Sequence, residues 1–360
     1  MARIDLDNIR HAYAPNPQKE SDYALRLVNQ TFEDGGAYAL LGPSGCGKTS
    51  MLNIISGLVA PTEGRVLFNG DDVTGRPTEK RNIAQVFQFP VVYDSMTVRE
   101  NLAFPLRNRG VKGADIRKRV DEVIDIVGLG ALADRRARGL TADEKQKISL
   151  GRGLVRPDVS AILFDEPLTV VDPHMKWQLR ASLREVHRRT NTTMIYVTHD
   201  QTEALTFASK VVVMYEGLIV QVGTPAELFD RPSHTFVGYF IGSPGMNIVP
   251  ASLDGARVQL GEHSVALAVA PRIAGKPKLE FGIRPEFVRL GAQGIPATVA
   301  RIEDAGRYRV AHLDMQGHSI AALLREGKEI PASPHIAFDP IGVHLYADSW
   351  RVDVNGAGAQ

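Results

Sequence analysis

The eight residues from Gly42 to Thr49 read Gly-Pro-Ser-Gly-Cys-Gly-Lys-Thr and fit the phosphate-binding pattern G-x-x-x-x-G-K-[ST]. In such a loop the glycines let backbone N–H groups approach phosphate oxygens, and the lysine reaches the terminal phosphates. Lys48 occupies the lysine position, and the hydroxyl of Thr49 is suited to ligate Mg²⁺. The alternative is a glycine-rich turn with a surface lysine. The apolar segment before the loop and the helical pattern after it favour the phosphate site.

A pair of carboxylates follows another apolar segment. Ala161–Phe164 is short and fully apolar, and it leads directly into Asp165, Glu166 and Pro167. Acidic side chains at the carboxyl end of a buried strand lie where open α/β sheets bind their ligands. We therefore expect Asp165 to hold Mg²⁺, directly or through water, and Glu166 to polarise an attacking water. A strand-terminating acidic turn is the simpler alternative, and the phosphate loop argues against it.

Two more polar side chains stand beside predicted strands. His199 follows the apolar segment that ends at Thr198, where it could contact a terminal phosphate or the attacking water. Gln88 lies between a predicted strand and a capping box, Thr97 to Glu100, that predicts the start of a helix. The amide oxygen of Gln88 could complete a metal shell. Each residue taken alone would more simply be structural or solvated, so both depend on the neighbouring motifs.

Alternating strands and helices must position these residues. Helical spacing predicts a helix after the phosphate loop, another over Asp115–Val127, and a third that carries Leu179, Leu183 and Val186. Short apolar segments predict buried strands at 37–41, 161–164 and 193–197. Strands that are apolar throughout imply a mostly parallel sheet covered on both faces. The fold class predicted for this part of the chain is therefore α/β.

The pattern changes after Ser243-Pro244-Gly245. Apolar residues then recur with period two and are interrupted by glycine and proline, which predicts a small all-β domain such as a barrel. The alternating positions are Val258 and Leu260; Val265, Leu267 and Val269; Val310 with Leu313 close by; and Val343 and Leu345. We place the boundary near residues 236–248. The expected domains are residues 1–240, with a helical part at about 90–155, and residues 248–360.

Composition narrows the class of protein. The 360 residues contain 42 Lys and Arg against 41 Asp and Glu, a net charge of +1, which does not favour nucleic acid as a partner. Cys46 is the only cysteine, so no disulfide can form within the chain. No stretch approaches the roughly 18 apolar residues that a membrane helix needs, and the first ten residues lack the apolar core of a signal peptide.

Taken in order, these motifs resemble the nucleotide-binding subunit of an ATP-binding cassette (ABC) transporter. The resemblance covers essentially the whole chain, and Phe281–Glu286 lies in a tail similar to the OB-like regulatory domain of importer ATPases for sugars, glycerol phosphate and polyols. It implies that Tyr13 stacks on adenine, that Gln88 senses the metal and the permease, that Asp172 crosses a dimer interface and that His199 is a switch histidine. The implied ATP-binding set is Tyr13, Gly42, Ser44, Gly45, Cys46, Gly47, Lys48, Thr49, Ser50 and Gln88, with Thr49, Gln88 and Asp165 on Mg²⁺ and Glu166 and His199 as catalytic residues.

The sequence departs from the family at the signature, which is usually Leu-Ser-Gly-Gly-Gln. Here Leu140 is followed by Thr141, Ala142, Asp143 and Glu144. Thr141 keeps a hydroxyl, but the glycines are lost and two carboxylates come close to the expected phosphate position, which is unfavourable unless they turn away. In a head-to-tail dimer this segment serves the partner's phosphate loop, so the change does not inactivate the chain's own site. The altered segment looks most like the paired ATPases of bacterial glycerol importers.

The resemblance implies an ATPase that powers import of a small polyol, most simply glycerol. Its partners would be a second, different ABC ATPase chain, two integral-membrane permeases and an extracellular or periplasmic solute-binding protein. The chain would lie peripherally on the cytoplasmic face of the cell membrane. One alternative is a regulatory subunit that binds ATP but hydrolyses it weakly, and another is an importer for sn-glycerol 3-phosphate or a sugar. A DNA-repair or translation ATPase and a kinase fit less well.

Overall fold

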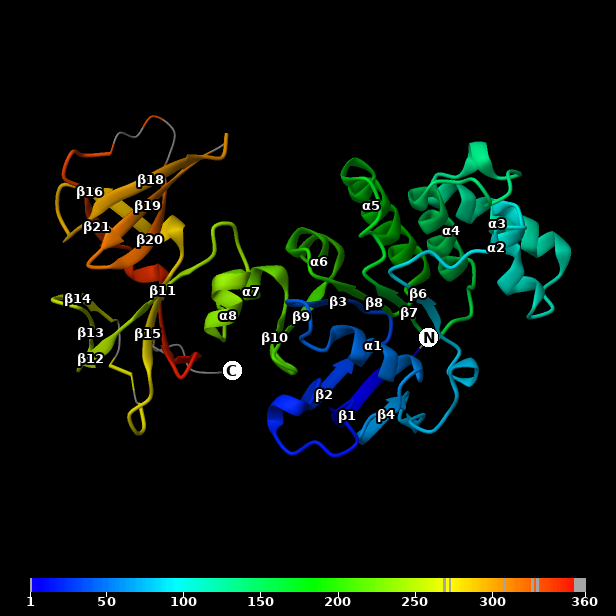
Figure 1. Ribbon diagram of the computed structural model, residues 1–360, viewed down its shortest axis with the longest axis horizontal. Coiled ribbons are helices and arrows are strands. Elements are labelled where there is room, and N and C mark those ends of the chain that lie inside the picture. The colour runs from blue at the N-terminus through cyan, green and yellow to red at the C-terminus, as the bar shows by residue number, and fades with distance from the viewer. Residues whose placement is uncertain are drawn as a thin grey trace. The chain divides into compact units, whose positions relative to one another are not determined.

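A six-stranded sheet carries the phosphate loop and the acidic pair (Figure 1). Its strand order is β10–β9–β3–β8–β7–β6. The strands are β3 (Ala37–Leu41), β6 (Ala84–Val86), β7 (Ile162–Asp165), β8 (Met194–Thr198), β9 (Lys210–Tyr215) and β10 (Leu218–Gly223). All neighbouring pairs are parallel except β9 and β10, which are antiparallel. The predicted strands at 37–41, 161–164 and 193–197 therefore correspond to β3, β7 and β8, and the α/β class is confirmed.

A second, antiparallel sheet packs over helix α1 (Lys48–Ser56). It has the order β2–β1–β4–β5, formed by β1 (Ile4–His11), β2 (Leu25–Phe32), β4 (Glu63–Phe68) and β5 (Asp71–Asp72). Ile4, Met51 and Ile195, from β1, α1 and β8, are fully buried in one shared apolar core. Helix α1 is thus held between the two sheets, which fixes the direction in which its first turn points.

Three helices pack against one another next to the sheet: α2 (Val98–Arg107), α3 (Gly113–Val127) and α4 (Ala142–Leu154). The predicted capping box at the start of α2 is present, because Thr97 accepts a hydrogen bond from the Glu100 backbone and the Glu100 carboxylate accepts one from the Thr97 backbone. Helices α5 (Pro173–Thr190) and α6 (Gln201–Phe207) follow β7 and β8. Among the described helices none is long and apolar enough to cross a bilayer.

The C-terminal part is built from short antiparallel strands around its own core. Two short helices, α7 (Pro225–Asp230) and α8 (Thr235–Phe240), come first. The strands are β11 (Asn247–Pro250), β12 (Ser252–Asp254), β13 (Arg257–Leu260), β14 (His263–Ala266), β15 (Leu279–Ile283), β16 (Val288–Gly291), β17 (Ile295–Pro296), β18 (Thr298–Asp304), β19 (Arg309–Met315), β20 (His318–Leu324), β21 (His335–Phe338), β22 (Val343–Ala347) and β23 (Trp350–Val352). Its core includes Val258, Leu260, Leu313, Val343 and Leu345, so an OB-like all-β tail is confirmed.

The structure describes residues 2–352 except 268, 269, 272, 307, 325, 326, 328 and 329, so Val269 and the last eight positions lie outside it. Contacts divide the chain into Met1–Pro225 and Ala226–Gln360. This division comes earlier than the expected boundary at 236–248. The reason is that Arg284 donates hydrogen bonds to the carbonyl oxygens of Phe229 and Ile241, which ties α7 and α8 to the C-terminal strands.

Candidate functional site

The phosphate loop leaves a fully buried strand, β3, and enters helix α1 with its backbone N–H groups uncapped. Gly47, at the helix N-cap, has a φ of 100° and provides no side chain to cap the first turn. A Cβ atom at Gly47 would lie 2.4 Å from the Ala24 carbonyl oxygen, and one at Gly42 would lie 2.2 Å from the Met214 carbonyl oxygen. Only glycine fits at these two positions. The loop therefore keeps free N–H donors at the positive end of a helix dipole, a setting that binds anions.

The Lys48 side chain is held inside the loop. Its Nζ donates hydrogen bonds of 2.8 Å to the carbonyl oxygens of Gly42 and Pro43, and only 5% of the residue is exposed. No carboxylate pairs with it among the described residues. The Lys48 side chain is thereby fixed next to the uncapped start of the helix, where it can donate to phosphate oxygens.

Thr49 and Asp165 bring two oxygen ligands together from different elements. The Thr49 hydroxyl, in the first turn of α1, donates a 3.1 Å hydrogen bond to Oδ1 of Asp165 at the end of β7. Burial raises the pKa of Asp165, the nearby Glu166 raises it further, and the Thr49 hydrogen bond and Lys48 counteract the shift. A buried carboxylate beside another acid is electrostatically strained until a cation approaches.

These oxygens fit Mg²⁺. The ion binds proteins through one or two oxygen ligands and takes substrate phosphates and waters for the rest. A hydroxyl and a carboxylate in contact beside a phosphate loop match that donor set. The described residues contain no cluster of three or more His, Cys, Asp or Glu that would suggest a metal cage. Gln88, the third expected ligand, is half-buried, and within the described part of the chain it makes no hydrogen bond to these two residues.

Glu166 and His199 face each other across the ends of neighbouring strands. Nδ1 of His199 lies 3.1 Å from Oε2 of Glu166. The Glu166 backbone has a φ of 45°, and its N–H donates to the Val197 carbonyl oxygen at 3.0 Å. A left-handed conformation is uncommon for a residue other than glycine, and such strain gathers at functional sites. The carboxylate is thus fixed, half-buried, beside Asp165 and within reach of an imidazole.

Tyr13 and Asp172 lie on segments that flank this centre. The Tyr13 ring is 67% exposed, and its hydroxyl lies 2.9 Å from Oγ of Ser50, one residue after Thr49. Asp172 is the N-cap of α5 and accepts a hydrogen bond from the His174 backbone. The structure brings Tyr13 to the phosphate-loop helix, whereas Asp172 stands at the start of its own helix.

Each of the two signature carboxylates has a partner on α4 or at its N-cap. Thr141 is the N-cap of α4, and its backbone N–H donates a 2.8 Å hydrogen bond to Oε2 of Glu144, which closes a capping box. Oδ2 of Asp143 lies 2.9 Å from Nζ of Lys147, one turn further along. Ala142 and Asp143 lie within regular helix, which any residue adopts, so the loss of glycine causes no backbone strain. The sequence analysis did not predict the Asp143–Lys147 ion pair, although the i,i+4 spacing of these residues on a helix was a signal for it.

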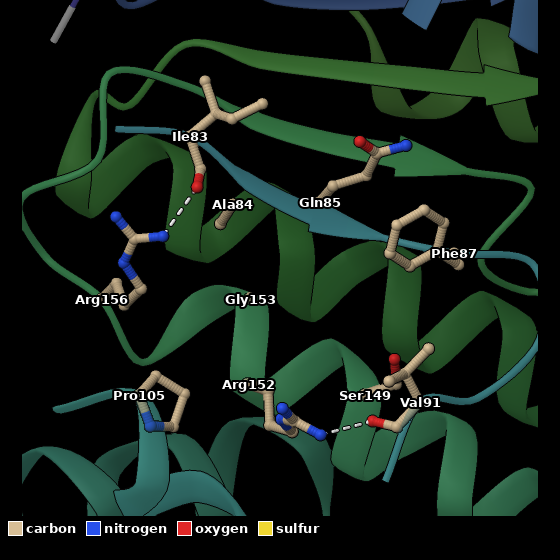
Figure 2. Close-up of a pocket in the computed structure, with 10 residues that line it drawn as sticks. All are labelled: Ile83, Ala84, Gln85, Phe87, Val91, Pro105, Ser149, Arg152, Gly153 and Arg156. Carbon is tan, nitrogen blue, oxygen red and sulfur yellow. Dashed lines mark hydrogen bonds between the residues drawn. The ribbon is translucent and has the colours of Figure 1, made fainter. Parts of the chain in front are cut away.

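A cavity of about 220 Å³ lies between the strand β6 region and helix α4 (Figure 2). Ile83, Phe87 and Val91 supply apolar walls, and Arg152 of α4 and Arg156, just after α4, line it as well. Arg152 donates to the Val91 carbonyl oxygen and Arg156 to the Ile83 carbonyl oxygen, as Figure 2 shows. The sequence reasoning missed this groove, because its walls come from segments about sixty residues apart.

Buried Gln146 connects this groove with the acidic pair. Its Nε2 donates to the carbonyl oxygens of Phe87, in the groove, and of Pro167, directly after Glu166. One side chain therefore links the groove wall to the backbone directly after Glu166.

Comparison with known proteins identifies the family. Residues 25–169 match the ABC transporter family model. The sn-glycerol-3-phosphate import ATP-binding protein of Bordetella bronchiseptica is 37% identical over 339 residues, 92% of this chain and 92% of that protein. This chain belongs to the ATP-binding proteins of ABC transporters. The trehalose import ATP-binding protein of Mycobacterium tuberculosis is 42% identical over 294 residues, covering 80% and 73% of the two chains.

A solved ABC structure agrees with this assignment. The dimeric post-hydrolysis state of the cassette MJ0796, bound to ADP and Pi, matches with a TM-score of 0.55 and 26% identity over 61% of this chain and 98% of that one. The family consists of ATPases, so ATP is the nucleotide of this site.

Proposed function

We propose that this chain hydrolyses ATP to power import of a small polyol, glycerol first, through a membrane ABC transporter. The observation that carries the proposal is the meeting of Lys48, the Thr49–Asp165 contact and the Glu166–His199 contact at the ends of neighbouring strands. Relatives named for import of sn-glycerol 3-phosphate and trehalose support a small polyhydroxy solute. The modified signature, which resembles that of paired glycerol importer ATPases, supports glycerol within that class.

In the proposed reaction the loop binds ATP. The uncapped N–H groups of α1 and the Lys48 ammonium bind the β and γ phosphates, and Ser44, Gly45, Cys46 and Ser50 line the same loop and helix turn. Tyr13 offers an exposed ring on which adenine can stack. Thr49, Asp165 and Gln88 would hold Mg²⁺. When bound, the ion neutralises charge on the β and γ oxygens.

Glu166 orients and polarises the attacking water through its carboxylate. His199, 3.1 Å from that carboxylate, fixes its orientation and is placed to contact the terminal phosphate or the water. The strained φ of Glu166 keeps its side chain from relaxing into an ordinary turn. Catalysis then depends on positioning and electrostatics, as is general for phosphoryl transfer.

The proposed working form is a head-to-tail pair of ATPase chains, in which Thr141, Ala142, Asp143 and Glu144 face the partner's ATP and Asp172 crosses the interface. The ABC cassette MJ0796 forms a dimer, which supports pairing. Tying Glu144 to the N-cap and Asp143 to Lys147 leaves the Thr141 hydroxyl as the group that faces phosphate. We propose a different chain as the partner, because a second chain could supply the usual glycine-rich signature.

We further propose that the groove beside α4 receives a short cytoplasmic helix of a membrane permease. Its apolar walls fit an apolar helix face, and Arg152 and Arg156 suit an acidic residue on that helix. Gln146 would pass the movement to Pro167. The chain would then sit on the cytoplasmic face of the membrane, held by two permeases, while a solute-binding protein outside delivers the solute.

The decisive experiment is Glu166→Gln in the assembled complex. We expect this variant to bind ATP normally and to trap it, with turnover reduced by at least about 100-fold, because the amide cannot polarise water as the carboxylate does. Glu185→Gln, at an exposed carboxylate of α5, is the matched control and should turn over normally. Normal turnover by Glu166→Gln would refute the catalytic role.

A second candidate is an ATP-binding subunit with weak hydrolysis that mainly regulates. The carboxylates of the signature favour it, since they would weaken the partner's site. Steady-state ATPase rates of this chain alone and with its partners separate the two functions. A rate that stays near zero in the assembled complex, and that Glu166→Gln does not lower, would favour the regulatory subunit.

The solute is tested in cells that carry Lys48→Ala in their own copy of this chain. We expect uptake of labelled glycerol to fall while uptake of labelled sn-glycerol 3-phosphate and trehalose continues. Loss of either of the other two uptakes, with glycerol uptake intact, would move the assignment to that solute.

A further inference from the structure

A buried histidine, His11, stands directly behind the exposed Tyr13. It is the last residue of β1, pairs with Leu25 of β2, and is 6% exposed. The ring centroids of His11 and Tyr13 are 4.7 Å apart and the ring planes meet at 82°, an edge-to-face contact. Such contacts favour a defined angle between rings, so the imidazole restrains the orientation of the tyrosine.

The tyrosine is held at its other end by the phosphate-loop helix. Its hydroxyl lies 2.9 Å from Oγ of buried Ser50. The backbone between the two rings is fixed as well, because the N–H of Ala12 donates to the Thr62 hydroxyl at 3.0 Å. The tyrosine is therefore largely exposed to solvent, but its ring contacts His11, its neighbouring backbone is bonded to Thr62, and its hydroxyl contacts Ser50.

The imidazole contributes as a ring and not through its nitrogens. Neither Nδ1 nor Nε2 of His11 has a hydrogen-bond partner among the described residues, and both atoms are buried. Burial lowers the pKa of His11. Nothing in the catalytic arrangement above uses this side chain, so its contact with Tyr13 is the feature left to explain.

We infer that His11 is a positioning residue that fixes Tyr13 as a preset platform for the adenine base. This inference rests on the proposed role of Tyr13 in binding ATP. A preset ring loses less freedom when the base stacks on it, so binding is tighter than with a mobile ring. His11 thereby acts on the base half of the nucleotide, whereas the loop and Lys48 act on the phosphate half.

The test compares ATP with inorganic triphosphate, which lacks a base. His11→Ala should raise the Kd for ATP between about 2-fold and 10-fold, the size of one aromatic contact, and leave the Kd for triphosphate unchanged. The KM for ATP should rise while kcat stays constant, because the hydrolytic groups are untouched. His11→Phe should restore the affinity, since a phenyl ring packs without needing the nitrogens.

A double-mutant cycle shows whether His11 acts through Tyr13. Tyr13→Ala should weaken ATP binding by at least about 5-fold, and adding His11→Ala to it should have no further effect. Ile9→Val trims a neighbouring buried side chain on the same strand and should leave ATP affinity unchanged. It controls for general loosening of β1.

The outcomes separate this inference from the function it rests on. If Tyr13→Ala binds ATP normally, the adenine role of Tyr13 is wrong, whatever His11 does. If Tyr13→Ala weakens binding but His11→Ala does not, the platform stands and the positioning role of His11 is overturned. Equal losses of ATP and triphosphate binding in His11→Ala, or no rescue by His11→Phe, would also overturn it.

Discussion

Helix α1 begins without a side-chain cap, whereas helix α4 begins inside a closed capping box. The first turn of α1 has no acidic residue, and its N-cap is Gly47. The first turn of α4 contains Asp143 and Glu144, and Thr141 accepts the N–H of Glu144. Both turns are expected to face phosphate, but α1 presents free donors and a lysine, whereas α4 presents a hydroxyl and two carboxylates, one paired with Lys147 and one bonded to the Thr141 N–H. We therefore expect the chain to bind its own ATP more tightly than it helps to bind the partner's ATP.

Removing the Lys48 side chain has the largest expected effect on this difference between α1 and α4. Lys48→Ala should lower ATP affinity by about 100-fold or more, because a buried charged donor to phosphate is lost. Lys145→Ala is the matched control on α4, where the lysine pairs with Asp94 at the surface, and should bind ATP normally. Equilibrium binding of a fluorescent ATP analogue measures both. Normal affinity in Lys48→Ala would mean that the loop does not hold the phosphates.

The Asp143–Lys147 pair is the next point at which the contrast can be tested. Lys147→Met should leave the Asp143 charge uncompensated and weaken ATP-driven pairing of Glu166→Gln complexes by about 10-fold. At an effective dielectric of about 20, two like charges about 10 Å apart repel by about 1.7 kcal/mol. The loss should shrink at high salt, and Asp143→Asn should reverse it in the double variant. Sedimentation at increasing ATP measures pairing, with Lys145→Met as the control.

If Lys147→Met pairs as well as the parent chain, the signature carboxylates do not face the partner's phosphate. The head-to-tail arrangement proposed for this segment would then be wrong. A loss that persists in the Asp143→Asn double variant would instead show that Lys147 acts by packing and not by neutralising charge.

The cap of α4 gives a smaller effect. Thr141→Ala should lower the free energy of unfolding by about 1 kcal/mol, because one N–H at the start of the helix loses its acceptor. Thr141→Ser keeps the hydroxyl and should restore most of that stability. Urea unfolding of the full chain measures both. Equal free energies of unfolding in the parent chain and both variants would show that the capping box does not stabilise the fold. The start of α4 would then be no better capped than the start of α1.

The candidate site residues could be named from the sequence because they lie within motifs or directly after predicted strands. Lys48, Thr49, Asp165, Glu166 and His199 each follow a short apolar segment, and parallel strands bring their carboxyl ends to one edge. The structure indeed joins Thr49 with Asp165 and Glu166 with His199. The position of these residues along the chain was enough to predict that they lie close together.

Features that depend on contacts between distant segments were not predictable in the same way. The antiparallel sheet formed by β1, β2 and β4 was missed, since Asn8 has a φ of 53° and a register shift interrupts the alternation of β1. The division of contacts after Pro225 could not be read from the sequence, because α7 and α8 are six residues each and are held by Arg284, more than forty positions later. The groove beside α4 likewise joins distant segments.

Cys46 gives the smallest expected effect and tests how closed the phosphate loop is. Its thiol is 3% exposed, and burial raises its pKa although Lys48, 3.8 Å away, counteracts the shift. A raised pKa keeps the thiolate fraction low, so alkylation at pH 8 should be much slower than for a free thiol and should accelerate as the pH rises. Cys46→Ala should change ATP affinity by less than about 2-fold, since the loop binds through backbone N–H groups and Lys48. Mass spectrometry after timed exposure to iodoacetamide measures the rate. Labelling as fast as that of a free thiol would mean that the loop opens in solution, and α1 would then resemble a mobile turn more than the preset anion site that its geometry indicates.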